Sequence, residues 1–150
     1  MTVGNAILLV EDNEDDVFLM RRALASAGVS NPVLVVESGQ RAVDYLAGEG
    51  GYHDRSKYPL PVIVFLDLKL PSMSGHEVLA WIRAQRQLES LMVVVLTSSD
   101  EPSDVRRSYS LGANSYLMKP LTARQLLDLT KAFNWTWLER TQPVGAPPKP

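Results

Sequence analysis

Acidic side chains that could bind a metal ion or act as nucleophiles follow two apolar runs of the sequence. Glu11 and Asp12 come directly after the run at 6–10, and Asp67 comes directly after the run at 61–66. Carboxylate oxygens, completed by water and phosphate, are the ligands that Mg²⁺ prefers. A carboxylate can also form an aspartyl phosphate. Asp67 stands alone after its run and is the better candidate nucleophile, whereas the adjacent pair is better suited to hold the metal ion.

A hydroxyl group and an ammonium group follow two further apolar runs. Thr97 ends the run at 91–96, and Lys119 ends the weaker run at 114–118. Phosphoryl transfer needs positioning and stabilisation of charge on the phosphoryl oxygens, which a metal ion, a lysine and a hydroxyl can supply. A cation and Lys119 would also offset the repulsion among the crowded carboxylates.

Five short apolar runs, most of them rich in Val and Ile, could position these side chains. Most do not alternate with polar residues, which is typical of strands covered on both faces. They are the segments 6–10, 32–36, 61–66, 91–96 and 114–118. Because ligands of open α/β sheets bind outside the carboxyl ends of the strands, the side chains that follow these runs should converge.

Segments with helical spacing lie between and after these runs. Ser74 and Thr122 are candidate N-caps, and Gly28, Gly48 and Gly112 are candidate stops. The expected helical faces carry Val17, Met20, Leu24 and Ala27; Val78, Ile82 and Gln85; and Leu126, Leu129 and Phe133, with two shorter helices at 41–47 and 102–111. Alternating strands and helices predict an α/β fold: one doubly wound, five-stranded parallel sheet with five helices, in three α/β/α layers.

Composition limits the function classes. The chain has 150 residues, 45% of them hydrophobic and 21% charged, which suits one folded domain. A net charge of −2 gives no reason to expect a nucleic-acid or membrane partner, and the absence of cysteine excludes disulfides and thiolate chemistry. We find no signal peptide and no long apolar window, so a cytoplasmic location is expected. The predicted domain covers 1–140, with a long loop at 48–61 and a Pro-rich mobile tail at 141–150.

The arrangement resembles the receiver domain of two-component response regulators over about residues 5–139. The acidic pair in "LLVEDNEDD", the loop "LDLKLPSMSG", the Thr in "LTSS" and the segment "YLMKP" carry the resemblance. It implies the strand order 2-1-3-4-5 and a phosphorelay role in which Asp67 accepts phosphate from a sensor histidine kinase. It also implies that Mg²⁺ is bound by Asp12, Asp67 and the backbone carbonyl of Lys69, with Glu11 acting mainly through water.

The same resemblance assigns the remaining site residues. Thr97 and Lys119 bind the attached phosphoryl group, Thr97 shifts toward it, and Tyr116 swings inward as the second switch residue. The surface formed by helix 4, strand 5 and helix 5 then changes its affinity for partners. Lys69 stands where the family often has Asn or another uncharged residue, and we hypothesise that its side chain modulates the lifetime of the phosphoaspartate.

A narrower resemblance concerns the loop at 48–61 and the ending "FNWTWL". These resemble small stand-alone regulators that pair with bacterial phytochrome kinases. The resemblance implies a bacteriophytochrome histidine kinase as partner and a homodimer. A downstream phosphotransfer protein is a further expected partner, and we expect no turnover enzyme beyond self-phosphorylation and slow autodephosphorylation. We interpret Trp81, Trp135 and Trp137 as packing or interface residues.

Specific residues or missing motifs argue against several alternative functions. The sequence lacks G-x-G-x-x-G after the first run and lacks a P-loop, so a nucleotide site is not expected. A haloacid-dehalogenase-type phosphatase would need a second acid where Lys69 stands. A pseudo-receiver that binds partners without phosphorylation is the remaining rival. We interpret Asp15 and Asp16 as helix-start acids that favour the helix dipole, and we assign no role to His53 or His76.

Overall fold

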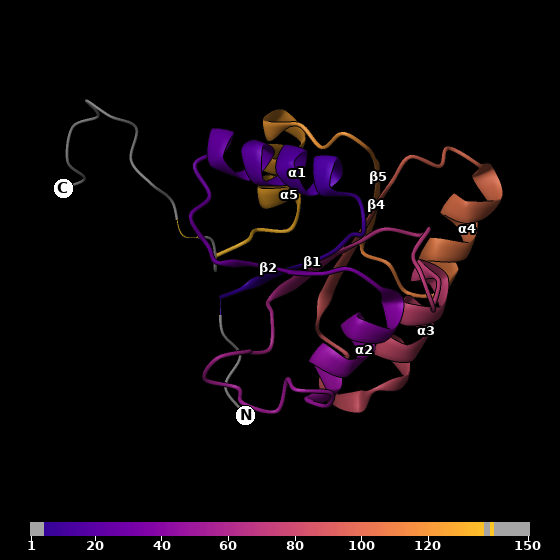
Figure 1. Cartoon of the computed structure of the whole chain (residues 1–150). Coiled ribbons are helices and arrows are strands. Elements are labelled where there is room, and N and C mark those ends of the chain that lie inside the picture. Colours follow the sequence, from indigo (N-terminus) through magenta and orange to yellow (C-terminus); the bar gives the residue numbers. More distant parts are fainter. Residues whose placement is uncertain (1–4, 137–138, 140–150) are drawn as a thin grey trace.

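The computed structural model describes residues 5–136 and 139. Within these residues five strands and five α-helices alternate, with one short 3₁₀ helix, η1, before the fourth strand (Figure 1). They are β1 (Ile7–Val10), α1 (Glu14–Ser26), β2 (Val33–Val36), α2 (Gly39–Ala47), β3 (Ile63–Leu66), α3 (Gly75–Ala84), η1 (Arg86–Leu88), β4 (Met92–Thr97), α4 (Pro102–Ser110), β5 (Ser115–Met118) and α5 (Ala123–Ala132). The five predicted strands are confirmed to within two residues at each end.

The strands form one parallel sheet in the order β2-β1-β3-β4-β5, as the resemblance implied. Helices α1 and α5 cover one face, and α2, α3 and α4 cover the other (Figure 1). The predicted three-layer α/β/α arrangement is therefore confirmed.

Two apolar cores explain why the strand sequences do not alternate with polar residues. Leu8, Val64 and Val95 pack toward α2 and α3 in one core, whereas Leu9 and Phe65 pack toward α1 and α5 in the other. Neighbouring side chains on a strand point to opposite faces, so both neighbours must be apolar when both faces are covered.

Local capping sets the ends of the helices much as the sequence predicted. Ser74 accepts a hydrogen bond from the backbone N–H of Glu77, and Thr122 forms a capping box with Gln125. Two expectations about helical faces are wrong: Gln85 and Phe133 lie just beyond the last helical residues of α3 and α5. Phe133 is 36% exposed, because α5 ends at Ala132 before a further turn can bring it onto the core.

The segment at 48–61 contains no helix or longer strand, but its own side chains hold it in place. The guanidinium of Arg55 donates to the carbonyl oxygens of Tyr45 and Leu46 at 2.8 and 2.9 Å, where α2 ends with unpaired carbonyls. The hydroxyl of Tyr45 donates to the carbonyl oxygen of Pro59 at 2.7 Å. This loop lies between the end of α2 and the start of β3, so it belongs to the edge of the sheet opposite the carboxyl ends of the strands.

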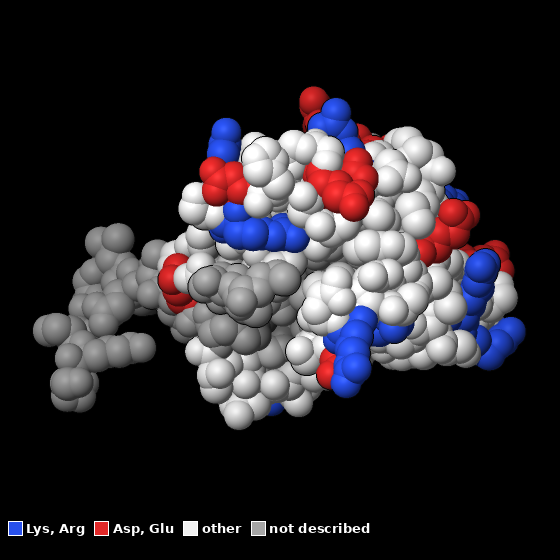
Figure 2. Space-filling view, turned by 90° about the horizontal axis from the view of Figure 1, so that it is seen from below, with Lys and Arg blue, Asp and Glu red and all other residues white. Residues whose placement is uncertain are grey.

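Charged side chains of both signs are scattered over the face seen in Figure 2. Among the described residues, no helix is long and apolar enough to cross a membrane. The predicted tail at 141–150 and Trp137 lie outside the described residues, whereas Trp135 is buried against the α1 and α5 core, as the packing interpretation predicted.

Candidate functional site

Three carboxylates that are distant in sequence meet at the carboxyl edge of the sheet. Glu11 and Asp12 follow β1, and Asp67 follows the neighbouring strand β3. Each residue offers one carboxylate oxygen, and these oxygens lie within 4.8 Å of one another. Glu11 and Asp67 are buried, whereas Asp12 is exposed. The site therefore has a buried floor and an open side.

The ammonium group of Lys119 reaches this cluster from the end of β5. Its Nζ lies 2.5 Å from Oε1 of Glu11 and 2.9 Å from Oδ2 of Asp67. A third carboxylate, that of Asp16 in the first turn of α1, lies 2.8 Å from the same nitrogen. An ammonium group has three hydrogens, and these three acceptors can take all of them. The Lys119–Pro120 peptide bond is cis.

The backbone after β3 orients the other oxygen of Asp67. Oδ1 accepts from the N–H of Leu68 at 2.7 Å and from that of Lys69 at 3.4 Å. Gly75, the first residue of α3, packs so closely that a Cβ there would overlap the carbonyl oxygen of Asp67. The carboxylate is therefore held between its own loop on one side and Lys119 on the other.

Burial and charge shift the pKa values of two groups in the cluster. Burial raises the pKa of Glu11, the charge of Asp67 raises it further, and the hydrogen bond from Lys119 only partly opposes them. Burial alone would lower the pKa of Lys119. Its hydrogen bonds to Asp16, Glu11 and Asp67 outweigh that effect and raise the pKa above its usual range, so the group stays cationic.

The two predicted switch residues both contact Ser99 in the loop after β4. Thr97 is fully buried, and its Oγ1 accepts from the N–H of Ser99 at 3.4 Å. Tyr116 is half-buried on β5, and its hydroxyl donates to the carbonyl oxygen of Ser99 at 2.7 Å. The hydroxyl of Ser99 donates in turn to Asp104 of α4 at 2.6 Å. Ser99 therefore links the two residues to α4, a role that the sequence analysis missed.

Lys69 lies at the mouth of the site. Its side chain is exposed, and no ion pair found among the described residues involves it. Its backbone N–H faces Asp67. The side chain is therefore available to an incoming group.

Asp16 is the ion-pair partner of Lys119 that the sequence analysis missed. It does lie in the acidic first turn of α1, as expected, but its carboxylate also contacts Lys119. Asn13 caps the helix by accepting from the N–H of Asp16 at 3.0 Å, which fixes the direction of the first turn. The signal was available in principle, because Asp16 lies in the first turn of the helix that follows the acidic pair of Glu11 and Asp12.

The donor set fits a hard divalent cation. Three carboxylate oxygens at this spacing, one of them on an exposed side chain, leave room for water and phosphate to complete an oxygen shell. Glu11 also accepts from the backbone N–H groups of Asp12 and Asn13, so its orientation is set by the chain itself.

The chain belongs to the response regulator receiver domain family, whose profile matches residues 7–131. It is a receiver-domain response regulator of phosphorelay signalling. One relative is the probable methanogenesis regulatory protein FilR2 of Methanothrix harundinacea, which is 40% identical over 88% of this chain and 83% of its own length.

Two solved structures extend the comparison. The bacteriophytochrome response regulator RtBRR is 42% identical, with a TM-score of 0.80 over 94% of this chain and 84% of its own. The Mn²⁺-bound form of response regulator Rcp1, a protein of Synechocystis sp., is 34% identical, with a TM-score of 0.72 over 92% of this chain and 97% of its own. The bound Mn²⁺ of that relative is a divalent cation of the kind that the carboxylate cluster of this chain could hold.

Proposed function

We propose that Asp67 accepts a phosphoryl group from a phosphohistidine of a sensor histidine kinase, in a reaction that depends on Mg²⁺. The observation that carries the proposal is the contact between Lys119 and Asp67, 52 residues apart, at 2.9 Å beside the carboxylate cluster. This contact puts a permanent cation next to a carboxylate oxygen that can attack phosphorus.

The transfer exchanges one bond for another. A carboxylate oxygen of Asp67 forms a bond to phosphorus while the P–N bond to the donor histidine breaks, and the departing imidazole takes up a proton. Asp12, Asp67 and the backbone carbonyl of Lys69 would hold Mg²⁺, with Glu11 acting mainly through water, and the ion would supply positive charge for the phosphoryl oxygens. Lys119 donates to one of those oxygens, and the hydroxyl of Thr97 donates to another.

The attached phosphoryl group then biases a second conformation. Thr97 moves toward the new acceptor, and Tyr116 follows it inward, which breaks its hydrogen bond to Ser99. Ser99 is tied to α4, so the surface of α4, β5 and α5 changes with it. The protein acts as a switch rather than as a turnover enzyme, with no catalysis beyond self-phosphorylation from small donors and slow autodephosphorylation.

The proposed kinase is a bacteriophytochrome, because RtBRR, named as a bacteriophytochrome response regulator, is 42% identical. FilR2, which is 40% identical, is named as a methanogenesis regulatory protein. A histidine kinase that is not a phytochrome is therefore the alternative partner. Phosphotransfer from each purified histidine kinase of the host tests the pairing, and rapid transfer from a non-phytochrome kinase alone would reject it. The protein would act in the cytoplasm.

A homodimer and a downstream phosphotransfer protein complete the proposed partners. Exposed apolar side chains on α4, on β5 and after α5 favour association: Tyr109, Met118 and Phe133. Sedimentation of the chain with and without phosphoryl donor tests dimerisation and its dependence on phosphorylation.

Acetyl phosphate with Mg²⁺ tests the phosphorylation itself. A receiver takes up one phosphoryl group per chain, and Asp67→Asn abolishes the label. Continuous release of phosphate would indicate a phosphatase instead. No label on the folded wild-type chain at any Mg²⁺ concentration would indicate a pseudo-receiver.

A further inference from the structure

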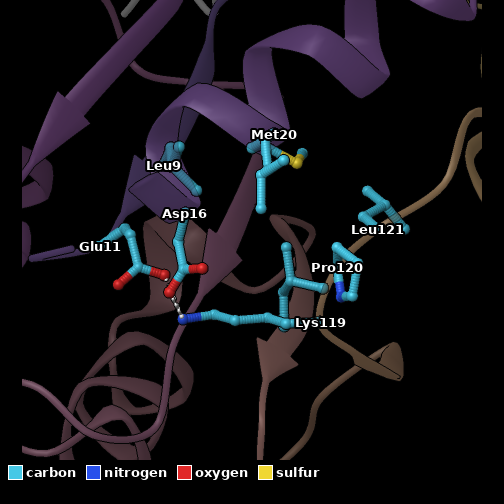
Figure 3. Close-up of a pocket in the computed structure, with 9 residues that line it drawn as sticks. Leu9, Glu11, Asp16, Met20, Lys119, Pro120 and Leu121 are labelled. Carbon is cyan, nitrogen blue, oxygen red and sulfur yellow. Dashed lines mark hydrogen bonds and ion pairs between the residues drawn. The ribbon is translucent and has the colours of Figure 1, made fainter. Parts of the chain in front are cut away.

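The carboxylate of Asp16 holds Lys119 from a position outside the metal-binding cluster. Figure 3 shows the carboxylates of Asp16 and Glu11 pointing at the tip of the Lys119 side chain, which extends away from Pro120 and Leu121. The distance from Oδ2 of Asp16 to Nζ is 2.8 Å. The Asp16 side chain is 31% exposed and the Lys119 side chain only 12%, so the contact is shielded on the lysine side.

The helix that carries Asp16 is firmly placed. Asn13 caps its first turn, and Met20 and Leu24 anchor it in the core beneath α1 and α5. Apolar side chains line the other walls around the lysine, namely those of Leu9, Leu19, Met20, Leu96 and Leu121. Within this small apolar enclosure, Asp16 and Glu11 are the polar side chains that can direct the ammonium group.

The three acceptors of Lys119 differ in what happens to them during phosphorylation, if the proposed function holds. Glu11 and Asp67 both belong to the carboxylate cluster, so a bound cation competes with the lysine for their oxygens. Asp67 also loses its negative charge on the oxygen that bonds to phosphorus. Asp16 belongs to neither the cluster nor the reaction, so it is the acceptor whose charge and partner are unchanged.

We infer that Asp16 is a positioning residue, which keeps the ammonium of Lys119 beside Asp67 while the metal ion and the phosphoryl group enter. The inference rests on the proposed function, because it assigns Asp16 its effect through Lys119 on phosphoryl transfer. Without the carboxylate of Asp16, the ammonium of Lys119 remains bound to two carboxylates that the metal ion also requires. The ammonium then loses its fixed approach to the phosphoryl oxygens.

A neighbouring acid separates this role from a general charge effect. Asp15 lies in the same helical turn and is exposed, and none of the ion pairs found among the described residues includes it. Asp15→Asn removes the same charge from the same helix end, so it is the matched control for Asp16→Asn. Both acids favour the helix dipole equally, and only one touches Lys119.

The experiment measures the rate of labelling by acetyl phosphate at saturating Mg²⁺ in wild type, Asp15→Asn, Asp16→Asn, Lys119→Met and the double variant Asp16→Asn/Lys119→Met. Removing a partner that orients a functional group typically costs about tenfold or more, so Asp16→Asn should label about tenfold more slowly. Asp15→Asn should stay within about twofold of wild type. In the Lys119→Met background, Asp16→Asn should change the residual rate by less than about twofold, since the two residues act through one contact.

Equilibrium binding of beryllofluoride, a stable mimic of a phosphoryl group on a carboxylate, gives a second readout that needs no chemical step. Its dissociation constant should rise about tenfold in Asp16→Asn and stay unchanged in Asp15→Asn. The inference is overturned if Asp16→Asn behaves like Asp15→Asn in both measurements, or if its full effect persists without Lys119. A wild-type chain that neither labels nor binds beryllofluoride overturns the proposed function instead.

Discussion

The hydroxyl of Tyr116 on β5 donates a hydrogen bond to the carbonyl oxygen of Ser99 at 2.7 Å, across the gap to the loop that follows β4. The backbone N–H of Ser99 donates to Oγ1 of Thr97, and its hydroxyl donates to the carboxylate of Asp104 on α4. The position of Tyr116 is therefore coupled to the loop before α4 by a bond that any inward rotation of the ring must break.

Tyr116→Phe should loosen this loop in the absence of phosphoryl donor. The variant keeps the ring and loses one hydrogen bond, worth about 1 kcal/mol, so amide exchange at Ser99 and Asp100 should quicken about fivefold. Tyr52→Phe, a similar loss of one hydroxyl at a distant half-buried site, is the control. Equal exchange in wild type and Tyr116→Phe would show that this bond does not hold the loop.

Lys119→Met should make the fold depend on a divalent cation. The ammonium offsets the charges of Glu11, Asp16 and Asp67, and removing one partner of a buried ion pair costs about 3 kcal/mol. The free energy of unfolding in EDTA should fall by about that amount. Added Mg²⁺ should stabilise the variant more than wild type, because the lysine no longer competes for the carboxylates. Thermal unfolding with and without Mg²⁺ measures both effects, and an equal gain in the two proteins would contradict the expected competition.

Ser108→Ala should destabilise the contact between α3 and α4. The hydroxyl of buried Ser108 donates to the carbonyl oxygen of Asp104 at 2.8 Å and lies 3.0 Å from Nε2 of His76. A hydroxyl has one hydrogen, so His76 must donate through Nε2–H. The variant leaves that donor without its acceptor and should lower the free energy of unfolding by about 1–2 kcal/mol.

Ser110→Ala is the control for this change, because Ser110 is exposed on the same helix and should change stability by less than about 0.5 kcal/mol. Nitrogen NMR of His76 tests the assigned tautomer directly. A neutral ring protonated at Nδ1 would contradict it.

Alkaline pH should weaken the fold through Tyr45. Burial raises the pKa of its phenol from 10.0 to about 12. Between these values the unfolded chain has released the proton and the folded chain retains it, so the free energy of unfolding falls as pH rises through this window. Tyr45→Phe has no such proton. Urea unfolding from pH 9 to pH 12 should show the advantage of wild type over Tyr45→Phe shrinking, and a constant difference would refute the assignment.

Lys69→Asn should shorten the lifetime of the phosphoaspartate several-fold. The exposed ammonium at the mouth of the site can contact the phosphoryl group and hinder the attack of water. Lys69→Arg keeps the charge and should retain most of the lifetime. Loss of label after removal of the phosphoryl donor gives the half-life of the phosphoaspartate. An unchanged half-life in Lys69→Asn would show that Lys69 is a solvated side chain without effect on that lifetime.

Much of the fold could be predicted because its signals are local. Val and Ile runs without alternation mark strands covered on both faces, and Ser74 and Thr122 mark helix starts through their own side chains. The order of the strands came from the family resemblance. The errors at Gln85 and Phe133 arose because a helical period does not say where the helix ends.

The site was predicted where strand ends supply the side chains, and missed where a helix or a loop does. Glu11, Asp67 and Lys119 each follow a strand, so the sheet brings them together. Asp16 and Ser99 join them through the angle of α1 and the path of the loop after β4, which depend on tertiary packing. The helix dipole by itself explains an acid in a first helical turn, so no contact between Asp16 and Lys119 was expected from the sequence.

The anchoring of the loop at 48–61 by Arg55 has a consequence for how a kinase approaches. This loop is the longest irregular segment among the described residues, and it is anchored at the edge of the sheet opposite the carboxyl ends of the strands. It therefore cannot fold over Asp67. An incoming phosphohistidine meets short connections whose shape is already set by strands and caps. Docking of the kinase should therefore need little rearrangement of this partner, and its association rate should be limited by orientation rather than by the opening of a gate.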